Sequence, residues 1–151
     1  MSSSKCGTLL DLNCLIALVD PDHQHHQAMH SWFQSSGHHD WGICPLTEAG
    51  FVRVTTNPAY GRGPRTIAQA GAILAGIPRS PGYRFWPITE SWGTLTAPFS
   101  ARLFGHQQAT DAYLLGLAVR EGGVLVTFDK GIQYLAGPEY SKHVQLLELR
   151  A

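Results

Sequence analysis

Two consecutive stretches decide the fold of this chain: TDAYLLGLA at Thr110–Ala118 and GGVLVTFD at Gly122–Asp129. Leucine and alanine recur at helical spacing in the first stretch, which predicts an amphipathic helix. The glycine pair that opens the second stretch ends this helix. The apolar run Val124–Val126 is typical of a short parallel strand covered on both faces. We therefore expect one helix that leads directly into one buried strand.

An acidic residue stands at each end of this helix–strand unit. Thr110 is a favourable N-cap, so Asp111 should fall in the first turn, where free amides and the helix dipole favour a carboxylate. Asp129 follows the carboxyl end of the strand, where open α/β sheets usually carry their chemistry. We expect the two carboxylates to share a crevice. Because close carboxylates repel each other, this crevice calls for a cation.

The composition indicates a single globular domain. The 151 residues suffice for one domain with a core and are too few for two ordinary ones, so we expect one domain over residues 1–151. The 44% hydrophobic and 15% charged residues exclude a disordered chain. No apolar run approaches the ~20 residues of a membrane span, and no signal core is present near the N-terminus. We expect a cytoplasmic protein with no membrane contact, whose thiols are free: Cys6, Cys14 and Cys44.

The charge balance permits a local surface for nucleic acid. The net charge is zero, but four metal-bound acids would leave 7 acidic residues beside 11 basic ones, most of them Arg. Arg62 and Arg65 flank a loop rich in Pro and Gly, and Arg102 and His106 precede the helix near Thr110. We expect these four basic side chains to contact phosphate groups, although an exposed Arg is more often merely solvated.

Short apolar stretches alternate with helical patterns along the rest of the chain. The expected elements are a strand at 7–13, helices at 14–19 and 23–35, a strand at 40–44, helices from 45 to 54 and from 65 to 75, an edge strand at 83–88, a short helix near Trp92 and a last strand at 144–149. This alternation predicts a parallel sheet covered on both faces. The fold class is thus α/β, a three-layer α/β/α sandwich around a mostly parallel sheet of four to five strands.

Two further acids occupy equivalent positions. Asp11 ends the first strand, and Glu48 lies in the first turn of the helix that Pro45 opens. Strand ends and helix starts gather at one edge of a parallel sheet, so Asp11, Glu48, Asp111 and Asp129 should converge there. Four oxygen donors without Cys or His favour Mg²⁺, or Mn²⁺ in its place, over Zn²⁺. Such a cluster suits the hydrolysis of a phosphodiester.

Polar neighbours accompany these acids. Asn13 and Thr127, each two residues from an acid, can orient metal-bound water or the carboxylates, and Thr110 is a third such neighbour. Glu48 has an alternative role, because a first-turn acid also completes a capping pattern or complements the helix dipole.

Six histidines lie between residues 23 and 39, and His26 and His30 have the i, i+4 spacing of a metal pair. No Cys or acid completes a convincing ligand set nearby, so we interpret this segment as a solvated helix face.

Four ordered motifs carry a family resemblance: LLDLN at Leu9–Asn13, PLTE at Pro45–Glu48, ATDAYLL at Ala109–Leu115 and LVTFDKG at Leu125–Gly131. They resemble the motifs of PIN-domain ribonucleases and, more narrowly, of the VapC toxins of bacterial toxin–antitoxin pairs. The resemblance covers the chain from Thr8 to about Leu149. It implies a Mg²⁺-dependent endoribonuclease that holds its metal with the four acids and cleaves structured RNA such as tRNA or ribosomal RNA. It also implies a cognate antitoxin and a homodimer.

Two other functions are weighed against this one. A catalytically silent PIN-like module that binds protein or RNA would be marked by loss of an acid, and none is missing. A phosphotransferase or phosphatase with Asp11 as nucleophile would need a second acid two residues later, and Asn13 cannot deliver a proton.

Overall fold

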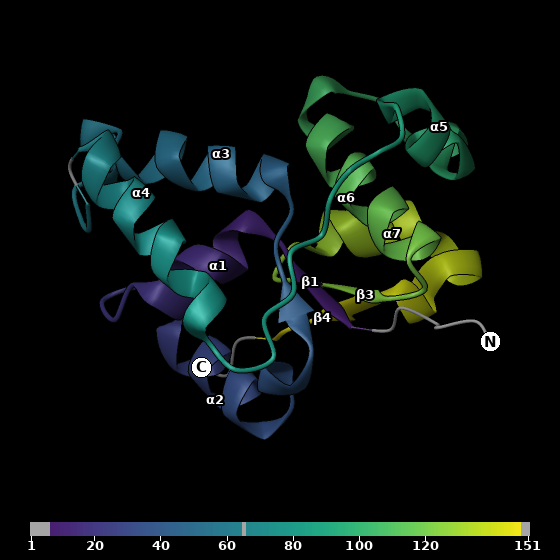
Figure 1. Ribbon diagram of the computed structural model, residues 1–151. Helices are drawn as coiled ribbons and strands as arrows, with labels where there is room; N and C mark the ends of the chain where they lie inside the picture. The colour runs from purple at the N-terminus through teal and green to yellow at the C-terminus, as the bar shows by residue number, and fades with distance from the viewer. Residues whose placement is uncertain (1–6, 65, 149–151) are drawn as a thin grey trace.

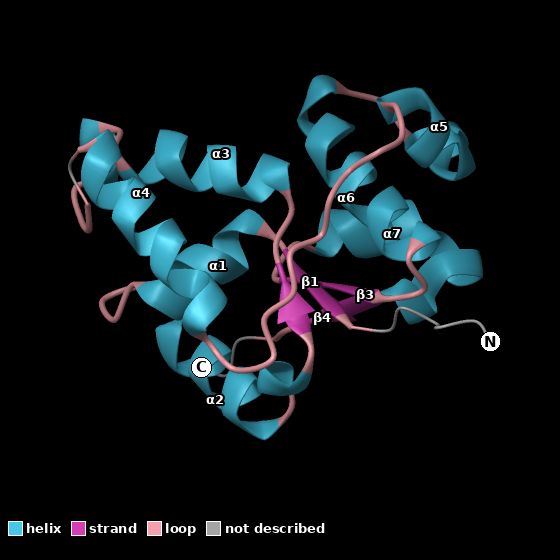
Figure 2. Cartoon of the chain, viewed as in Figure 1, coloured by secondary structure: helices cyan, strands magenta, loops and turns pink. Residues whose placement is uncertain are grey.

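Four short strands form one wholly parallel sheet at the centre of the molecule (Figure 2). The computed structural model describes residues 7–64 and 66–148. The strands lie in the order β2-β1-β3-β4. Their bounds are β1 Thr8–Leu10, β2 Trp41–Gly42, β3 Val124–Thr127 and β4 Val144–Leu146. The central strands are therefore the first strand of the chain and the one singled out from the sequence.

Two groups of helices cover the two faces of the sheet (Figure 1). One group comprises α1 Leu12–Val19, α2 His26–Ser35, α3 Pro45–Thr55 and α4 Ile67–Gly76. The other comprises α5 Trp92–Thr96, α6 Ala109–Arg120 and α7 Lys130–Tyr140. Single 3₁₀ turns connect them: η1 Gly37–His39, η2 Pro58–Tyr60, η3 Ile77–Arg79, η4 Ala97–Arg102, η5 His106–Gln108 and η6 Ser141–His143.

The core is divided between the two faces by the alternation of the strands. Leu9 and Leu125 pack with the group that includes α6 and α7, whereas Leu10 and Val126 pack with the group that includes α1 and α3. Consecutive strand residues point to opposite faces, so these apolar runs are buried on both sides. The predicted three-layer α/β/α sandwich is confirmed.

The predicted edge strand at 83–88 is not formed as a strand. Its backbone is extended and follows β2, since Arg84 N–H donates to Trp41 O at 2.8 Å and Trp86 N–H donates to Ile43 O at 3.0 Å. Only one isolated parallel bridge, between Trp41 and Tyr83, results. Two causes are visible in the chain: β2 is two residues long before Pro45 opens α3, and Pro87 has no N–H to donate.

Several element bounds also differ from the sequence prediction. The predicted helix at 23–35 begins only at His26, because Asp20 holds a turn: its carbonyl accepts from His23 N–H at 3.0 Å and its Oδ1 from Asp22 N–H at 3.0 Å. The last strand, predicted over 144–149, ends at Leu146, and residue 149 lies outside the described part of the chain. Gly122 ends α6 as predicted, with φ of 71°.

Two further expectations from composition can be compared with the structure. Cys14 and Cys44 are free and buried, and burial raises the pKa of both thiols, whereas Cys6 lies outside the described residues. Within residues 7–64 and 66–148, no helix has the length and apolar character needed to cross a membrane.

Gly42 provides a test of the contact between β2 and the extended segment. A Cβ at this position would lie 1.7 Å from Arg84 O and 2.7 Å from Trp86 Cδ1, so Gly42→Ala must displace the segment. We expect a loss of at least about 2 kcal/mol in the free energy of unfolding, measured by urea denaturation. The matched control is Gly71→Ala in α4, where nothing lies within 4 Å and the helix should gain about 0.5–1 kcal/mol. Equal effects of the two substitutions would contradict this account of the β2 edge.

Candidate active site

Asp11 is fixed by its position at the end of β1 and the start of α1. Its side chain caps α1, with Leu12 N–H donating to Oδ1 at 2.7 Å, and Thr127 Oγ1–H donates to Oδ2 at 2.8 Å. The residue is only 8% exposed. Burial raises the pKa of Asp11, the two hydrogen bonds oppose that rise, and the charge of Asp129 adds to it. Both carboxylate oxygens therefore have a set orientation in a poorly solvated position.

Thr127 connects this acid with the second strand end. Its side chain is fully buried at the end of β3, where its hydroxyl donates to Asp11 and accepts from Asp129 N–H at 3.0 Å. Asp129 in turn caps α7, with Gly131 N–H donating to its Oδ1 at 2.7 Å. The exposed Asp129 carboxylate thus has one oxygen engaged by the backbone.

Asp111 reaches the same site from α6. It lies in the first turn of α6, as predicted, but the cap of this helix is Gln108 and not Thr110. α6 begins two residues earlier than the predicted cap implies because the η5 turn runs straight into it, so Thr110 is already helical. Burial, followed by the charges of Asp11 and Asp129, raises the pKa of Asp111 to about 7. Electrostatic coupling among the three aspartates shows that their carboxylates share one environment.

The three aspartates line a cleft of about 220 Å³ at the carboxyl edge of the sheet. Its other walls come from α1, α3 and α6. The complete lining is Asp11, Leu12, Asn13, Leu46, Thr47, Gly50, Arg53, Thr110, Asp111, Leu114 and Asp129. The structure therefore brings together three of the four predicted acids, together with Asn13 and Thr110.

Glu48 is not among the residues that line this cleft. Leu46, Gly50 and Arg53 recur at i, i+4 and i+7, so one face of α3 is turned to the cleft, and Glu48 is rotated roughly 200° from Leu46. On its own side, the Glu48 charge adds to burial in raising the pKa of Tyr83 to about 12. A position in the first turn fixes where a residue lies along the helix axis but does not fix the side of the helix on which it lies. The metal-binding role of Glu48 stays a prediction.

Arg53 is a cleft residue that the sequence did not single out. It is exposed in the last turn of α3 and brings a positive charge to a cleft lined by three aspartates. The available signal was its spacing, because Leu46, Gly50 and Arg53 share one face of the helix. Guanidinium is well suited to a phosphate oxygen.

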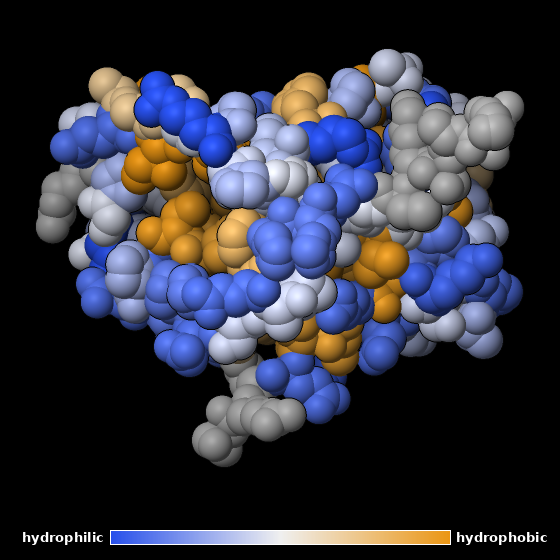
Figure 3. Space-filling model, turned by 60° about the horizontal axis from the view of Figure 1, so that its bottom comes forward, coloured by the Kyte–Doolittle hydropathy of each residue, from blue (hydrophilic) through white to orange (hydrophobic). Residues whose placement is uncertain are grey.

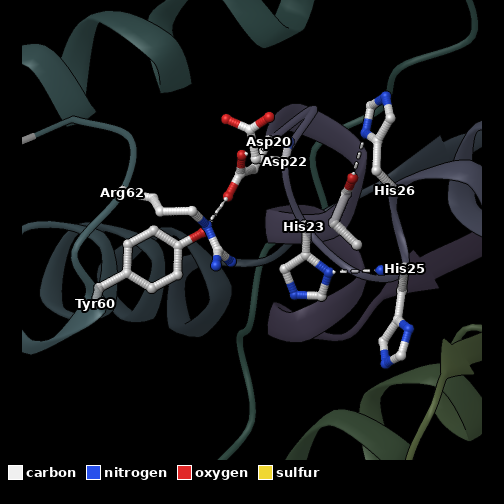
Figure 4. A network of polar contacts seen from close by, with 8 residues as sticks. Asp20, Asp22, His23, His25, His26, Tyr60 and Arg62 are labelled. Atoms are coloured by element: carbon white, nitrogen blue, oxygen red, sulfur yellow. Dashed lines mark hydrogen bonds and ion pairs between the residues drawn. The ribbon is translucent and has the colours of Figure 1, made fainter.

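Three of the four predicted RNA-binding residues, Arg62, Arg102 and His106, are not among the residues that line the cleft. Figure 4 shows Arg62 directed at Asp20, with Nε 3.1 Å from Oδ2 and the guanidinium 5.0 Å from the ring centre of Tyr60. Arg65 lies outside the described residues. Arg102 contacts α7, and His106 is exposed in η5 just before α6. Their contact with RNA stays a prediction.

The histidine segment makes several local contacts. His26 Nδ1 lies 2.7 Å from Ala17 O, and His25 N–H donates to His23 Nδ1 at 3.0 Å (Figure 4). The His25 ring packs 4.7 Å from the ring of Phe128. These contacts fasten the start of α2 to α1 and to the end of β3.

The carboxylates suit a hard divalent cation by their chemistry. Over residues 7–64 and 66–148, no three His, Cys, Asp or Glu side chains are grouped as preformed metal ligands. Burial, followed by the charge of neighbouring aspartates, raises the pKa of both Asp11 and Asp111, and a cation would offset this concentration of negative charge. The donors are oxygens only, which fits Mg²⁺ or Mn²⁺. Asp11, Asp111 and Asp129 are the residues that would hold it.

Comparison with known proteins agrees with this architecture. Residues 8–138 match the PIN domain family. The chain is 41% identical to Ribonuclease VapC38 of Mycobacterium tuberculosis, covering 93% of this chain and 98% of that protein. It is 39% identical to Ribonuclease VapC44 of the same species, covering 89% and 94%. The chain therefore belongs to the PIN domain family, among its VapC ribonucleases.

Solved structures support the same fold. The structure of FitAB bound to an IR36 DNA fragment superposes with a TM-score of 0.64 at 19% identity, covering 95% of this chain and 98% of that one. FitAcB from Neisseria gonorrhoeae gives a TM-score of 0.61 at 17% identity, covering 85% and 92%. The α/β arrangement is thus shared with chains that are less than 20% identical to this one.

The raised pKa of Asp111 predicts a specific pH dependence of stability. Because the folded-state pKa of about 7 exceeds the ordinary value of 3.8, the native protein binds more protons than the unfolded chain between these values. Stability should therefore fall as pH rises from about 4 to 7, and the loss should be complete above 7. Asp111→Asn removes this contribution, so its free energy of unfolding in EDTA should exceed that of the wild type increasingly across this window. A difference that is constant with pH would contradict the coupling of the three aspartates.

Proposed function

We propose that this protein is a Mg²⁺-dependent endoribonuclease toxin that hydrolyses phosphodiester bonds in structured RNA such as tRNA or ribosomal RNA. The observation that carries the proposal is the cleft that Asp11, Asp111 and Asp129 line in a chain of the VapC type. Mn²⁺ is expected to substitute for Mg²⁺, since both take oxygen ligands. The cytoplasm is the expected location, where such RNAs are available.

The chain's own residues divide the work of the cleft. A bound divalent cation would supply an activated water and charge stabilisation at the scissile phosphate. Thr127 holds the Asp11 carboxylate through a buried hydrogen bond of 2.8 Å, and Gly131 N–H holds one oxygen of Asp129. Asp111, whose pKa is raised to about 7, would hold the cation in its deprotonated form, so cation binding would favour loss of its proton. Arg53, which lines the same cleft, binds a phosphate oxygen next to the cleaved bond.

We propose protein partners for two reasons, the family to which the chain belongs and an apolar surface of the structure. The VapC relatives support a cognate antitoxin, and the notion of a homodimer comes from the family resemblance. A hollow of about 250 Å³, lined among others by Ile16, Phe51 and Ile73, lies between α1, α3 and α4. Figure 3 shows apolar side chains gathered on the side of the molecule that carries α1 and α4. We propose that this face contacts another protein. Sedimentation of the chain with and without its antitoxin distinguishes a homodimer from a complex with the antitoxin.

Substitution of Asp129 tests the proposed chemistry with little risk to the fold. Asn is also a good N-cap, so Asp129→Asn should leave α7 intact while removing a charged oxygen from the cleft. We expect cleavage of purified total RNA in Mg²⁺ to fall by more than about 100-fold, beyond the roughly 10–100-fold of residues that only orient ligands. Asp22→Asn, on an exposed turn residue away from the cleft, is the matched control and should cleave like the wild type.

The same assay separates a nuclease from the silent binding module. Wild-type cleavage should stop in EDTA and return on addition of Mg²⁺ or Mn²⁺. Full activity of Asp129→Asn, or wild-type activity unaffected by EDTA, would overturn the proposed mechanism. Binding of RNA without any cleavage by the partner-free wild type would favour the binding module.

Glu48 needs its own test because it is not among the residues that line the cleft. If Glu48 acts on the metal in the complex with RNA, Glu48→Gln should reduce cleavage about as strongly as Asp129→Asn. If its role is confined to the start of α3, the variant should lose only about 0.3–1 kcal/mol of stability and keep its activity. We predict the first outcome, and cleavage rates together with urea denaturation decide between the two.

A further inference from the structure

Three exposed aromatic residues belong to the segment that leads into the acidic cleft or are hydrogen-bonded to it. Trp92 is 45% exposed, Phe104 78% and Tyr134 52%. Large aromatic side chains are usually buried for most of their area, so exposed ones that gather in one region mark a contact surface. Trp92 and the backbone of Phe104 are hydrogen-bonded to residues at the start of α6. Tyr134 lies in α7, the helix whose N-cap is Asp129.

Trp92 is joined directly to α6. Its Nε1–H donates to Ala109 O at 2.9 Å, and Ala109 is followed by Thr110 and Asp111, which line the cleft. The indole ring is therefore held in place while almost half of the residue stays accessible. Trp32, Trp41 and Trp86 are buried, so the indole exposed on this surface is that of Trp92.

Phe104 is presented by a loop that one side chain closes. Gln108 Oε1 accepts from Phe104 N–H at 2.7 Å and from Gly105 N–H at 3.2 Å, and Gln108 Nε2–H donates to Arg102 O at 3.1 Å. The backbone on either side of the ring is thus ordered, and the ring itself points to solvent. A preorganised exposed ring binds a partner with a small loss of conformational entropy.

Tyr134 combines an aromatic ring with a cation. Arg102 Nη1–H donates to Tyr134 O at 3.1 Å, and the guanidinium lies 5.3 Å from the ring centre. Tyr134 belongs to α7, whose cap is Asp129, so this pair and the cleft share one rigid helix. Flat rings next to a guanidinium match the two chemistries of a nucleic acid strand, the face of a base and the phosphate.

We propose that Trp92, Phe104 and Tyr134, with Arg102, form a stacking surface that binds unpaired RNA bases next to the acidic cleft. This inference rests on the proposed ribonuclease function and specifies its substrate. Bases in a duplex cover each other's faces, whereas bases of a loop or single strand can stack on exposed rings. The RNA is therefore unpaired where it lies beside the cleft, even when it is structured elsewhere.

Binding measured without cleavage tests this surface. Fluorescence anisotropy in EDTA compares a short labelled single-stranded RNA with the same sequence closed in a hairpin. We expect Phe104→Ala to weaken single-strand binding roughly 5- to 100-fold and to leave hairpin-stem binding unchanged. Phe104→Tyr, which keeps an aromatic face, should bind like the wild type. Ile67→Ala in α4, at a residue 71% exposed, is the control for loss of apolar surface elsewhere.

The fluorescence of Trp92 gives a second readout. Single-stranded RNA should quench the exposed indole and shield it from acrylamide, and Trp92→Phe should abolish this change. Unchanged binding by Phe104→Ala, or an equal loss for single strand and hairpin, overturns the stacking surface even if Mg²⁺-dependent cleavage is intact. Loss of single-strand binding in Phe104→Ala, combined with a wild type that cleaves no RNA, supports the surface and instead refutes the proposed nuclease function.

Discussion

The hydrogen bond from Thr127 Oγ1 to Asp11 Oδ2 is the interaction on which the candidate site depends. It joins the ends of the two central strands, and the same hydroxyl accepts from Asp129 N–H, so one buried threonine sets the relative positions of two acids. The parallel sheet determines where the other parts of the site lie. Strand ends and helix starts meet at one edge, which places the first turn of α6 and the cap of α7 around the same cleft.

This arrangement concentrates charge that the protein itself does not neutralise. Asp11 is buried, and repulsion adds to burial in raising the pKa of Asp111 to about 7. Arg53 also lines the cleft, and the exposed ring of Trp92 lies beside the start of α6. In the proposed mechanism the aspartates of the cleft hold a cation, Arg53 binds a phosphate oxygen, and the aromatic rings beside the cleft bind bases.

The sequence predicted those features that depend on the order of elements along the chain. Apolar runs and helical spacing gave the three layers, and the positions of Asp11, Asp111 and Asp129 gave the cleft. It did not predict features that depend on rotation about a helix or on exact pairing. Glu48 is in the expected turn of α3 but is not among the residues that line the cleft, whereas Arg53, which was not predicted, lines it. The segment at 83–88 makes a single bridge with the two-residue strand β2.

The central claim is that the aspartates of this cleft together bind a divalent cation. It is tested most directly by titrating the partner-free protein with Mn²⁺ and following the electron paramagnetic resonance signal of free Mn²⁺. The account predicts saturable binding by the wild type, weakened as pH falls below about 7 and weakened at every pH in Asp129→Asn. Binding of equal affinity in the wild type and Asp129→Asn would contradict it.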